Sequence, residues 1–142
     1  MAHIPDFDAL QVGQEVFESA KVIRREDVKA YADASGDQNP LHQDDDFAHG
    51  VGFPGIIAHG MFSMAHLTKA LKDWAGNPAS LKSISVQFRS VVYMDETLVA
   101  KGRIASKNEA TKEVTLDVWE ELERDGQRVT PIKNSRAVVS LA

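Results

Sequence analysis

Hydrophobic and polar residues change their spacing near the middle of this chain, which divides it into a helical first half and a strand-rich second half. The segment 15–23 predicts a short strand after a turn at Val12-Gly13. The segment 25–35 predicts a helix, because acidic residues occupy its first turn, a glycine follows it, and three hydrophobic residues share one face: Val28, Tyr31 and Ala32.

The longest predicted helix spans 58–74 and ends at Gly76-Asn77-Pro78. Its apolar residues cover more than one stripe, which is typical of a buried helix. Before it, the three aspartates 44–46 suit the start of one further helical turn that ends near Ala48. Carboxylates at that position meet free N–H groups and the positive end of the helix dipole.

Four strands are predicted in the second half, at 84–88, 98–105, 114–122 and 129–141. Asp125-Gly126 is a hairpin signal between the last two, and Pro131 predicts a bulge or an edge position near the start of the last strand. Since no helix separates these strands, the sheet should be antiparallel. The sequence therefore predicts an α+β fold in which a curved antiparallel sheet of about five strands wraps around one long central helix.

The composition is that of a soluble globular protein, with 142 residues, 43% of them hydrophobic and 26% charged. This length predicts a single domain over 1–142. The net charge of −5 without a basic stripe argues against nucleic acid as a partner, and the absence of cysteine rules out disulfides and thiol nucleophiles. No secretory signal opens the sequence and no apolar run approaches ~18 residues, so we expect a cytoplasmic protein with no membrane span.

The segment 36–42, Gly-Asp-Gln-Asn-Pro-Leu-His, places a carboxylate and an imidazole on one tight loop. Pro40 stiffens the loop, and Asn39 can bond its backbone groups and fix the turn. Asp37 and His42 then converge from a short rigid segment, where such a pair can hold a water molecule and move its protons. The alternative is a simple turn in which Asp37 caps a backbone N–H and His42 lies on the surface.

Gly60 stands near the start of the long helix, where two interpretations are open. It can serve close packing of the helix against the sheet. It can also let a substrate approach the backbone, where free N–H groups at a helix N-terminus stabilise negative charge. We expect His59 to be a packing residue that shapes the loop in front of Gly60.

These two segments, in this order, resemble the MaoC-like dehydratases, the (R)-specific enoyl-thioester hydratases of hot-dog fold. The specific match covers about residues 28–68, and the strand half agrees in pattern. The segment 89–96 departs from the family, which often has a proline and then a glycine after the strand that follows the central helix. The matching residues are Tyr31, Ser35-Gly36-Asp37, Asn39-Pro40-Leu41-His42, Phe47-Ala48, Ile57-Ala58-His59-Gly60-Met61 and Val86-Gln87-Phe88-Arg89.

The resemblance implies a role for each matching site residue. Asp37 and His42 correspond to the pair that activates a water for syn addition to a trans-2-enoyl thioester. Gly60 corresponds to the glycine whose backbone N–H polarises the thioester carbonyl, and Asn39 to a loop-fixing residue. Thr68 falls where some members place a hydroxyl that bonds the catalytic aspartate. The product is an (R)-3-hydroxyacyl thioester, or the reaction runs in reverse as a dehydration.

We expect no metal and no cofactor beyond the carrier of the thioester, which is coenzyme A or acyl carrier protein. The spacing of His42, His49, His59 and His66 fits no common metal-ligand motif. Basic residues on the predicted strands are interpreted as a solvated face, and only Arg89 is a weak candidate for contact with carrier phosphates.

The leading prediction is an (R)-specific enoyl-CoA hydratase, or hydro-lyase, of fatty acid metabolism. One alternative is an acyl-carrier-protein dehydratase subunit of a fatty-acid elongation system. Another is a non-catalytic acyl-thioester-binding subunit, although such a subunit would be expected to lose Asp37 or His42. A thioesterase on the same fold is disfavoured by the hydratase loop. An unpaired edge strand predicts a homodimer or higher homo-oligomer, and a heterodimer with a second hot-dog subunit also fits.

Overall fold

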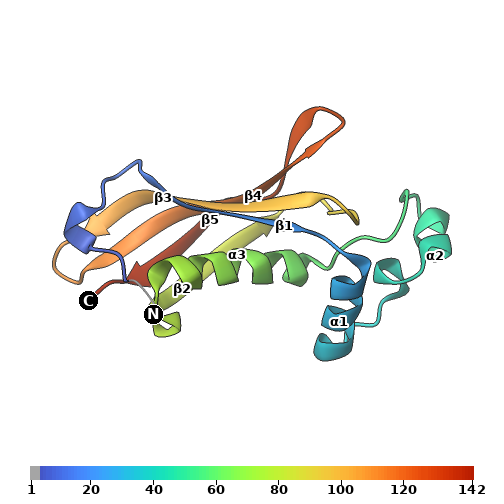
Figure 1. The fold of residues 1–142 in the computed structure, drawn as a ribbon, viewed down its shortest axis with the longest axis horizontal. Helices are drawn as coiled ribbons and strands as arrows, with labels where there is room; N and C mark the ends of the chain where they lie inside the picture. Colours follow the sequence, from blue (N-terminus) through green and yellow to red (C-terminus); the bar gives the residue numbers. More distant parts are fainter. Residues whose placement is uncertain (1–3) are drawn as a thin grey trace.

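One long helix lies across a five-stranded antiparallel sheet, and two short helices extend beyond one end of that sheet (Figure 1). The structure is a computed structural model that describes residues 4–142. Residues 1–3 lie outside the described residues, and they are the start of the N-terminal segment in which no secretory signal is found. No helix in the described part of the chain is long and apolar enough to cross a membrane.

Local capping signals set the ends of the helices. Gly36 and Gly76 adopt left-handed conformations, with φ of 82° and 77°, and each ends the helix before it. Asp44 accepts hydrogen bonds from the N–H groups of Asp46 and Phe47, as the aspartate run predicts. The α-helices are α1 (Arg25–Ser35), α2 (Asp45–Gly50) and α3 (Gly60–Ala75), and the 3-10 turns are η1 (Phe7–Ala9), η2 (Pro40–His42) and η3 (Pro78–Ser80).

The sheet confirms the predicted antiparallel arrangement, in the spatial order β1-β3-β4-β5-β2. The middle strands are longer than the hydrophobic pattern predicts, because the ladder continues through polar residues at the strand ends. Edge strands β1 and β2 leave one side of their backbone unpaired in the described chain. The bounds are β1 (Glu15–Val22), β2 (Leu81–Phe88), β3 (Thr97–Asn108), β4 (Glu113–Arg124) and β5 (Gln127–Ser140).

Two turn predictions can be followed in the backbone of the last hairpin. Asp125 and Gly126 both have positive φ, 54° and 75°, as a two-residue type I′ turn requires. Pro131 lies inside the sheet, because β5 runs between β4 and β2, so its edge alternative is wrong. The pairing shifts from Leu122–Val129 to Glu120–Ile132, which leaves one extra residue on β5, so the bulge alternative is confirmed.

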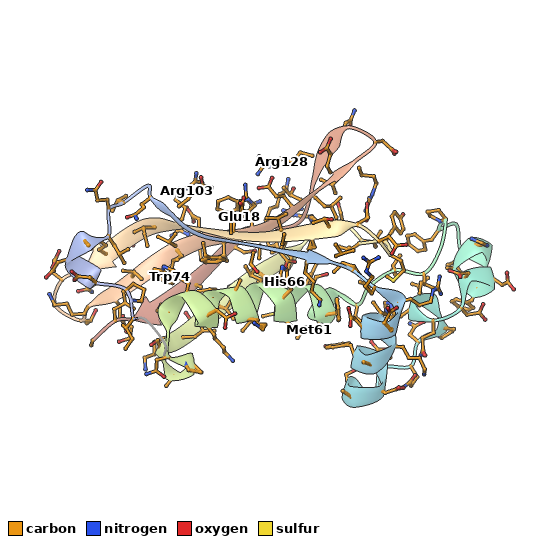
Figure 2. All side chains as sticks on the ribbon, in the orientation of Figure 1. Glu18, Met61, His66, Trp74, Arg103 and Arg128 are labelled. Atoms are coloured by element: carbon orange, nitrogen blue, oxygen red, sulfur yellow. The ribbon has the colours of Figure 1, made fainter. Side chains whose placement is uncertain are left out.

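Helix α3 packs one face on the concave side of the sheet and leaves the other face open. Leu67 and Leu71 are fully buried in the core, whereas Met61 is 56% exposed. Figure 2 shows Met61 on the side of α3 turned away from the sheet, and Glu18, Arg103 and Arg128 on the opposite surface of the sheet. The hot-dog arrangement is thus confirmed, but the prediction that α3 is buried on most faces is wrong for this chain alone, since the sheet covers one face only.

Candidate active site

The loop between α1 and α2 is fixed by side chains that bond its own backbone. The Ser35 hydroxyl accepts from the Asp37 N–H, and Asp37 Oδ1 accepts from the Asn39 N–H at 3.2 Å. Asn39 Oδ1 accepts from the Leu41 N–H at 3.0 Å, as predicted for this residue. Asp37 therefore caps a backbone N–H, as the turn alternative predicts. Its second oxygen, Oδ2, takes no part in this turn.

His42 is anchored by one ring nitrogen and presents the other. Its Nδ1 lies 2.7 Å from the carbonyl oxygen of Ile57, so Nδ1 carries the proton and donates it. Nε2 is then available as an acceptor in neutral His42. The ring is half-buried, so the alternative of a surface histidine is wrong. The sequence could not show this, because Ile57 lies fifteen residues further on.

His59 is buried and links the two predicted catalytic residues. Its ring stacks on that of His42, and its Nε2 donates to the Asp37 carbonyl oxygen at 3.2 Å, with Asp37 Oδ2 3.9 Å away. The Tyr31 ring packs on it with centroids 4.9 Å apart. Burial lowers the pKa of His59, and its Nδ1 has no hydrogen-bond partner in the described structure. His59 is therefore a neutral ring that holds the loop against α3, which fits its predicted packing role.

Asp37, His42 and His59 each bring one oxygen or nitrogen to within 4.8 Å of the others. Two groups joined by a single water lie roughly 4.5–5 Å apart, given ordinary hydrogen-bond lengths. The same triplet meets the distance criterion for a metal ion, although His59 Nε2, which donates to the Asp37 carbonyl, would not be a ligand to it. The separation of the three groups fits a water shared between them.

Gly60 is the first residue of α3, at the rim of a cavity of about 330 Å³ that His42 also lines. A Cβ added at Gly60 would lie 3.4 Å from the Phe88 ring, so the glycine keeps a narrow space open between the helix start and β2. The first N–H groups of a helix have no partner within it and attract negative charge. Other lining residues include Ser63, Val91 and Ile132.

Two hydroxyl groups on α3, those of Thr68 and Ser63, differ in their relation to the site. Thr68 lies two turns beyond Gly60, and its hydroxyl donates to the Met64 carbonyl at 2.9 Å. No hydrogen bond joins it to Asp37 in residues 4–142, so the predicted bond is not formed. Ser63, which sequence reasoning missed, is buried and lines the cavity one turn after Gly60. The available signal was its spacing of three residues from Gly60, which puts both on one helix face.

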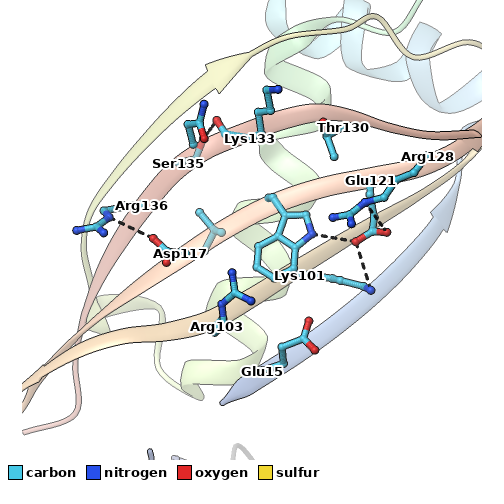
Figure 3. A pocket seen from close by; sticks show the side chains of 13 residues that line it. Glu15, Lys101, Arg103, Asp117, Glu121, Arg128, Thr130, Lys133, Ser135 and Arg136 are labelled. Atoms are coloured by element: carbon cyan, nitrogen blue, oxygen red, sulfur yellow. Dashed lines mark hydrogen bonds and ion pairs between the residues drawn. The ribbon is translucent and has the colours of Figure 1, made fainter. Parts of the chain in front are cut away.

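A larger hollow of about 790 Å³ lies on the outer surface of the sheet, away from α3 and the loop (Figure 3). Its side chains pair with one another. Lys101 lies 3.3 Å from Glu121, which also contacts Arg128 and the Trp119 N–H. Neither Asp37 nor His42 reaches it. This surface is the strand face on which the sequence places basic residues, and its ion pairs range from half-buried, as in Lys101–Glu121, to largely exposed on the Arg128 side.

Comparison with known proteins agrees with this fold. The family model described as "MaoC like domain" matches residues 9–123. The chain is 25% identical to the (R)-hydratase from A. caviae involved in PHA biosynthesis, with a TM-score of 0.83 over 94% of this chain and 98% of that one.

Two curated relatives come from Arabidopsis thaliana. One is the peroxisomal enoyl-CoA hydratase 2, 41% identical over 69 residues, which are 47% of this chain and 22% of that protein. The other is the mitochondrial 3-hydroxyacyl-[acyl-carrier-protein] dehydratase, 36% identical over 91 residues, 63% of this chain and 53% of that protein. The chain thus spans about a fifth of the first and about half of the second. With the family model covering most of its length, the chain belongs to the MaoC-like domain family.

Proposed function

We propose that this protein hydrates trans-2-enoyl thioesters to (R)-3-hydroxyacyl thioesters, and catalyses the reverse dehydration. The observation that carries the proposal is the convergence of Asp37, His42 and His59 to within 4.8 Å, beside a cavity that begins at Gly60. The (R)-hydratase similarity over nearly the whole chain supports the same reaction.

The hydrogen bonds of the site support one course for this reaction. His42 Nε2 and the Asp37 carboxylate hold one water, because His42 Nδ1 is already committed to Ile57. One O–H bond of that water breaks as its oxygen bonds to C3 of the substrate, and the proton is delivered to C2. Negative charge develops on the thioester oxygen in between, where N–H groups at the start of α3 stabilise it. In dehydration the same steps run backwards.

The test is hydration of crotonyl-CoA, followed by loss of the enoyl absorbance. Asp37→Asn and His42→Ala should each lower turnover by about 10²–10⁴-fold, because each removes one of the groups that move the proton. Asp46→Asn and His49→Ala are matched controls on exposed residues of α2 and should retain activity. Full activity in either loop variant would refute the assignment, provided that circular dichroism shows a folded protein.

A second candidate is the same chemistry on an acyl-carrier-protein thioester. It is favoured by the similarity to the acyl-carrier-protein dehydratase, in which the match covers 63% of this chain. Parallel assays with crotonyl-CoA and crotonyl-acyl carrier protein decide between them, through the ratio of the two kcat/KM values. A chain that binds both thioesters without turning over either would be the non-catalytic subunit.

We further propose that the protein works as at least a homodimer, with β2 at the contact. This edge strand ends in Phe88, which is 49% exposed and beside the cavity, and Met61 on α3 is also exposed. An unpaired strand edge next to exposed apolar side chains is a surface that proteins cover. Light scattering should give about twice the chain mass, and a monomer at assay concentrations would contradict it.

A further inference from the structure

Glu120 is a carboxyl group inside the core that no part of the proposed chemistry uses. The alternation along β4 places Val118, Glu120 and Leu122 on the face that α3 covers. Glu120 has 0% exposure, and neither of its carboxyl oxygens has a hydrogen-bond partner within the described residues. Burial alone raises its pKa to about 9, so near neutral pH it is an uncharged acid with one donor and one free acceptor.

Such a group needs an explanation, because buried polar atoms in proteins almost always have partners. The opposite surface of β4 shows the usual solution: Glu121, the next residue, contacts Lys101 and Arg128. Glu120 has no comparable neighbour, since burial is the only cause of its pKa shift. An unpaired group of this kind on the inner face of a sheet is what a ligand with a matching polar atom would complete.

The register of the sheet places Glu120 in line with the cavity. Phe88 pairs with Ile132, and Ile132 pairs with Glu120, so the three side chains form a row on one face of the sheet. The first two line the cavity, and Phe88 lies against Gly60. Neighbouring strands are ~4.8 Å apart, so Glu120 lies about 10 Å from Phe88 along this row.

We propose that Glu120 forms the polar end of the acyl-binding site and selects thioesters whose acyl chain carries a hydroxyl or carbonyl group towards its distal end. This rests on the proposed function, which puts the thioester carbonyl at Gly60. From Gly60 the row of Phe88, Ile132 and Glu120 leads inward from the cavity, which ends at Ile132 in the free protein. The acyl chain must therefore open the last step, between Ile132 and the fully buried carboxyl of Glu120. A distal hydroxyl donates to the carbonyl oxygen of Glu120 or accepts from its O–H, whereas a hydrocarbon end leaves both unpaired.

Binding tests this without relying on turnover. The probes are N-acetylcysteamine thioesters of octanoic acid and of ω-hydroxyoctanoic acid, which lack the reactive double bond and any large carrier. Their affinities are measured by NMR titration against the parent protein, Glu120→Leu and Glu120→Gln. The parent should bind the hydroxylated compound about tenfold more tightly, the magnitude of a desolvated hydrogen bond. Glu120→Leu should reverse the preference, and Glu120→Gln should keep part of it, because an amide also donates and accepts.

Equal affinities in the parent, no binding of either probe, or a preference that survives Glu120→Leu would each overturn the inference. The corresponding trans-2-enoyl thioesters are then assayed for hydration. Discrimination in binding without any hydration would refute the proposed function and leave this role of Glu120 standing. Hydration of both enoyl compounds at equal kcat/KM, with equal binding, would leave the proposed function standing and refute this role of Glu120.

Discussion

The ring of His59 stacks on the ring of His42, with centroids 3.8 Å apart and planes inclined by 25°. His59 also donates to the backbone of Asp37, so one buried side chain touches both members of the proposed catalytic pair. A residue in this position is placed to fix the distance between the carboxylate and the imidazole.

His59→Phe should therefore lower kcat by roughly 10²-fold while KM changes little, because the stacking surface remains but the bond to the Asp37 carbonyl is lost. The measurement is crotonyl-thioester hydration as a function of pH, since a displaced His42 also changes the pH profile. His49→Phe is the control on an exposed histidine of α2. A pH profile and kcat equal to those of the parent would mean that His59 only packs.

Gly60→Ala should separate activity from stability. The added Cβ would lie 3.4 Å from Phe88, an ordinary van der Waals contact, so the melting temperature should stay close to that of the parent. The methyl group nevertheless occupies the approach to the helix N-terminus, and kcat/KM should fall by about 10²-fold. Gly50→Ala has nothing within 4 Å of its Cβ and should leave activity unchanged. Loss of stability with normal activity per folded molecule would show that Gly60 serves packing alone.

Arg124 holds the wall of the cavity through a bidentate pair with Glu96. Its Nε and one terminal nitrogen lie 2.7 and 2.6 Å from the two carboxylate oxygens, and the latter nitrogen also donates to the Val91 carbonyl. Arg124→Lys should cost about 1–3 kcal/mol in chemical denaturation, because lysine cannot reproduce the fork. Arg128 pairs with Glu121 and its side chain is 63% exposed, so Arg128→Lys should cost less than ~1 kcal/mol. Equal losses of stability in the two variants would show that the bidentate geometry of Arg124 adds no stability.

Glu120 should make the protein less stable as pH rises. Its ordinary pKa is 4.5 and its pKa in the folded chain is about 9, so between these values the unfolded state is ionised and the folded state is not. The stabilising effect of the shift is complete below pH 4.5 and is lost as pH rises towards 9. At pH 7 the loss is on the order of 3 kcal/mol.

Glu120→Leu should therefore raise the free energy of unfolding at pH 7 and flatten its dependence on pH between about 5 and 9. Urea denaturation at several pH values measures both effects. Glu123→Gln, an exposed residue of the same strand, should leave the pH slope unchanged. If the free energy of unfolding of the parent protein does not change between about pH 5 and 9, Glu120 has a partner in solution.

The sequence by itself determined the elements and the loop, because their signals are local. Gly36 and Gly76 end their helices, Asp125-Gly126 makes the hairpin, and Asn39 fixes the turn through a residue two positions away. Each of these features depends on backbone conformation over a few residues, which residue type controls directly.

Only the tertiary structure decided what surrounds these groups. The bond from His42 to Ile57, the contact of His59 with Asp37 and the open face of α3 join segments that the chain brings together by folding. Glu120 shares the inner face of β4 with Val118 and Leu122, and a pattern of apolar positions cannot show that no cation or donor lies opposite it. Such contacts depend on strand register and helix placement, which are set by packing over the whole domain.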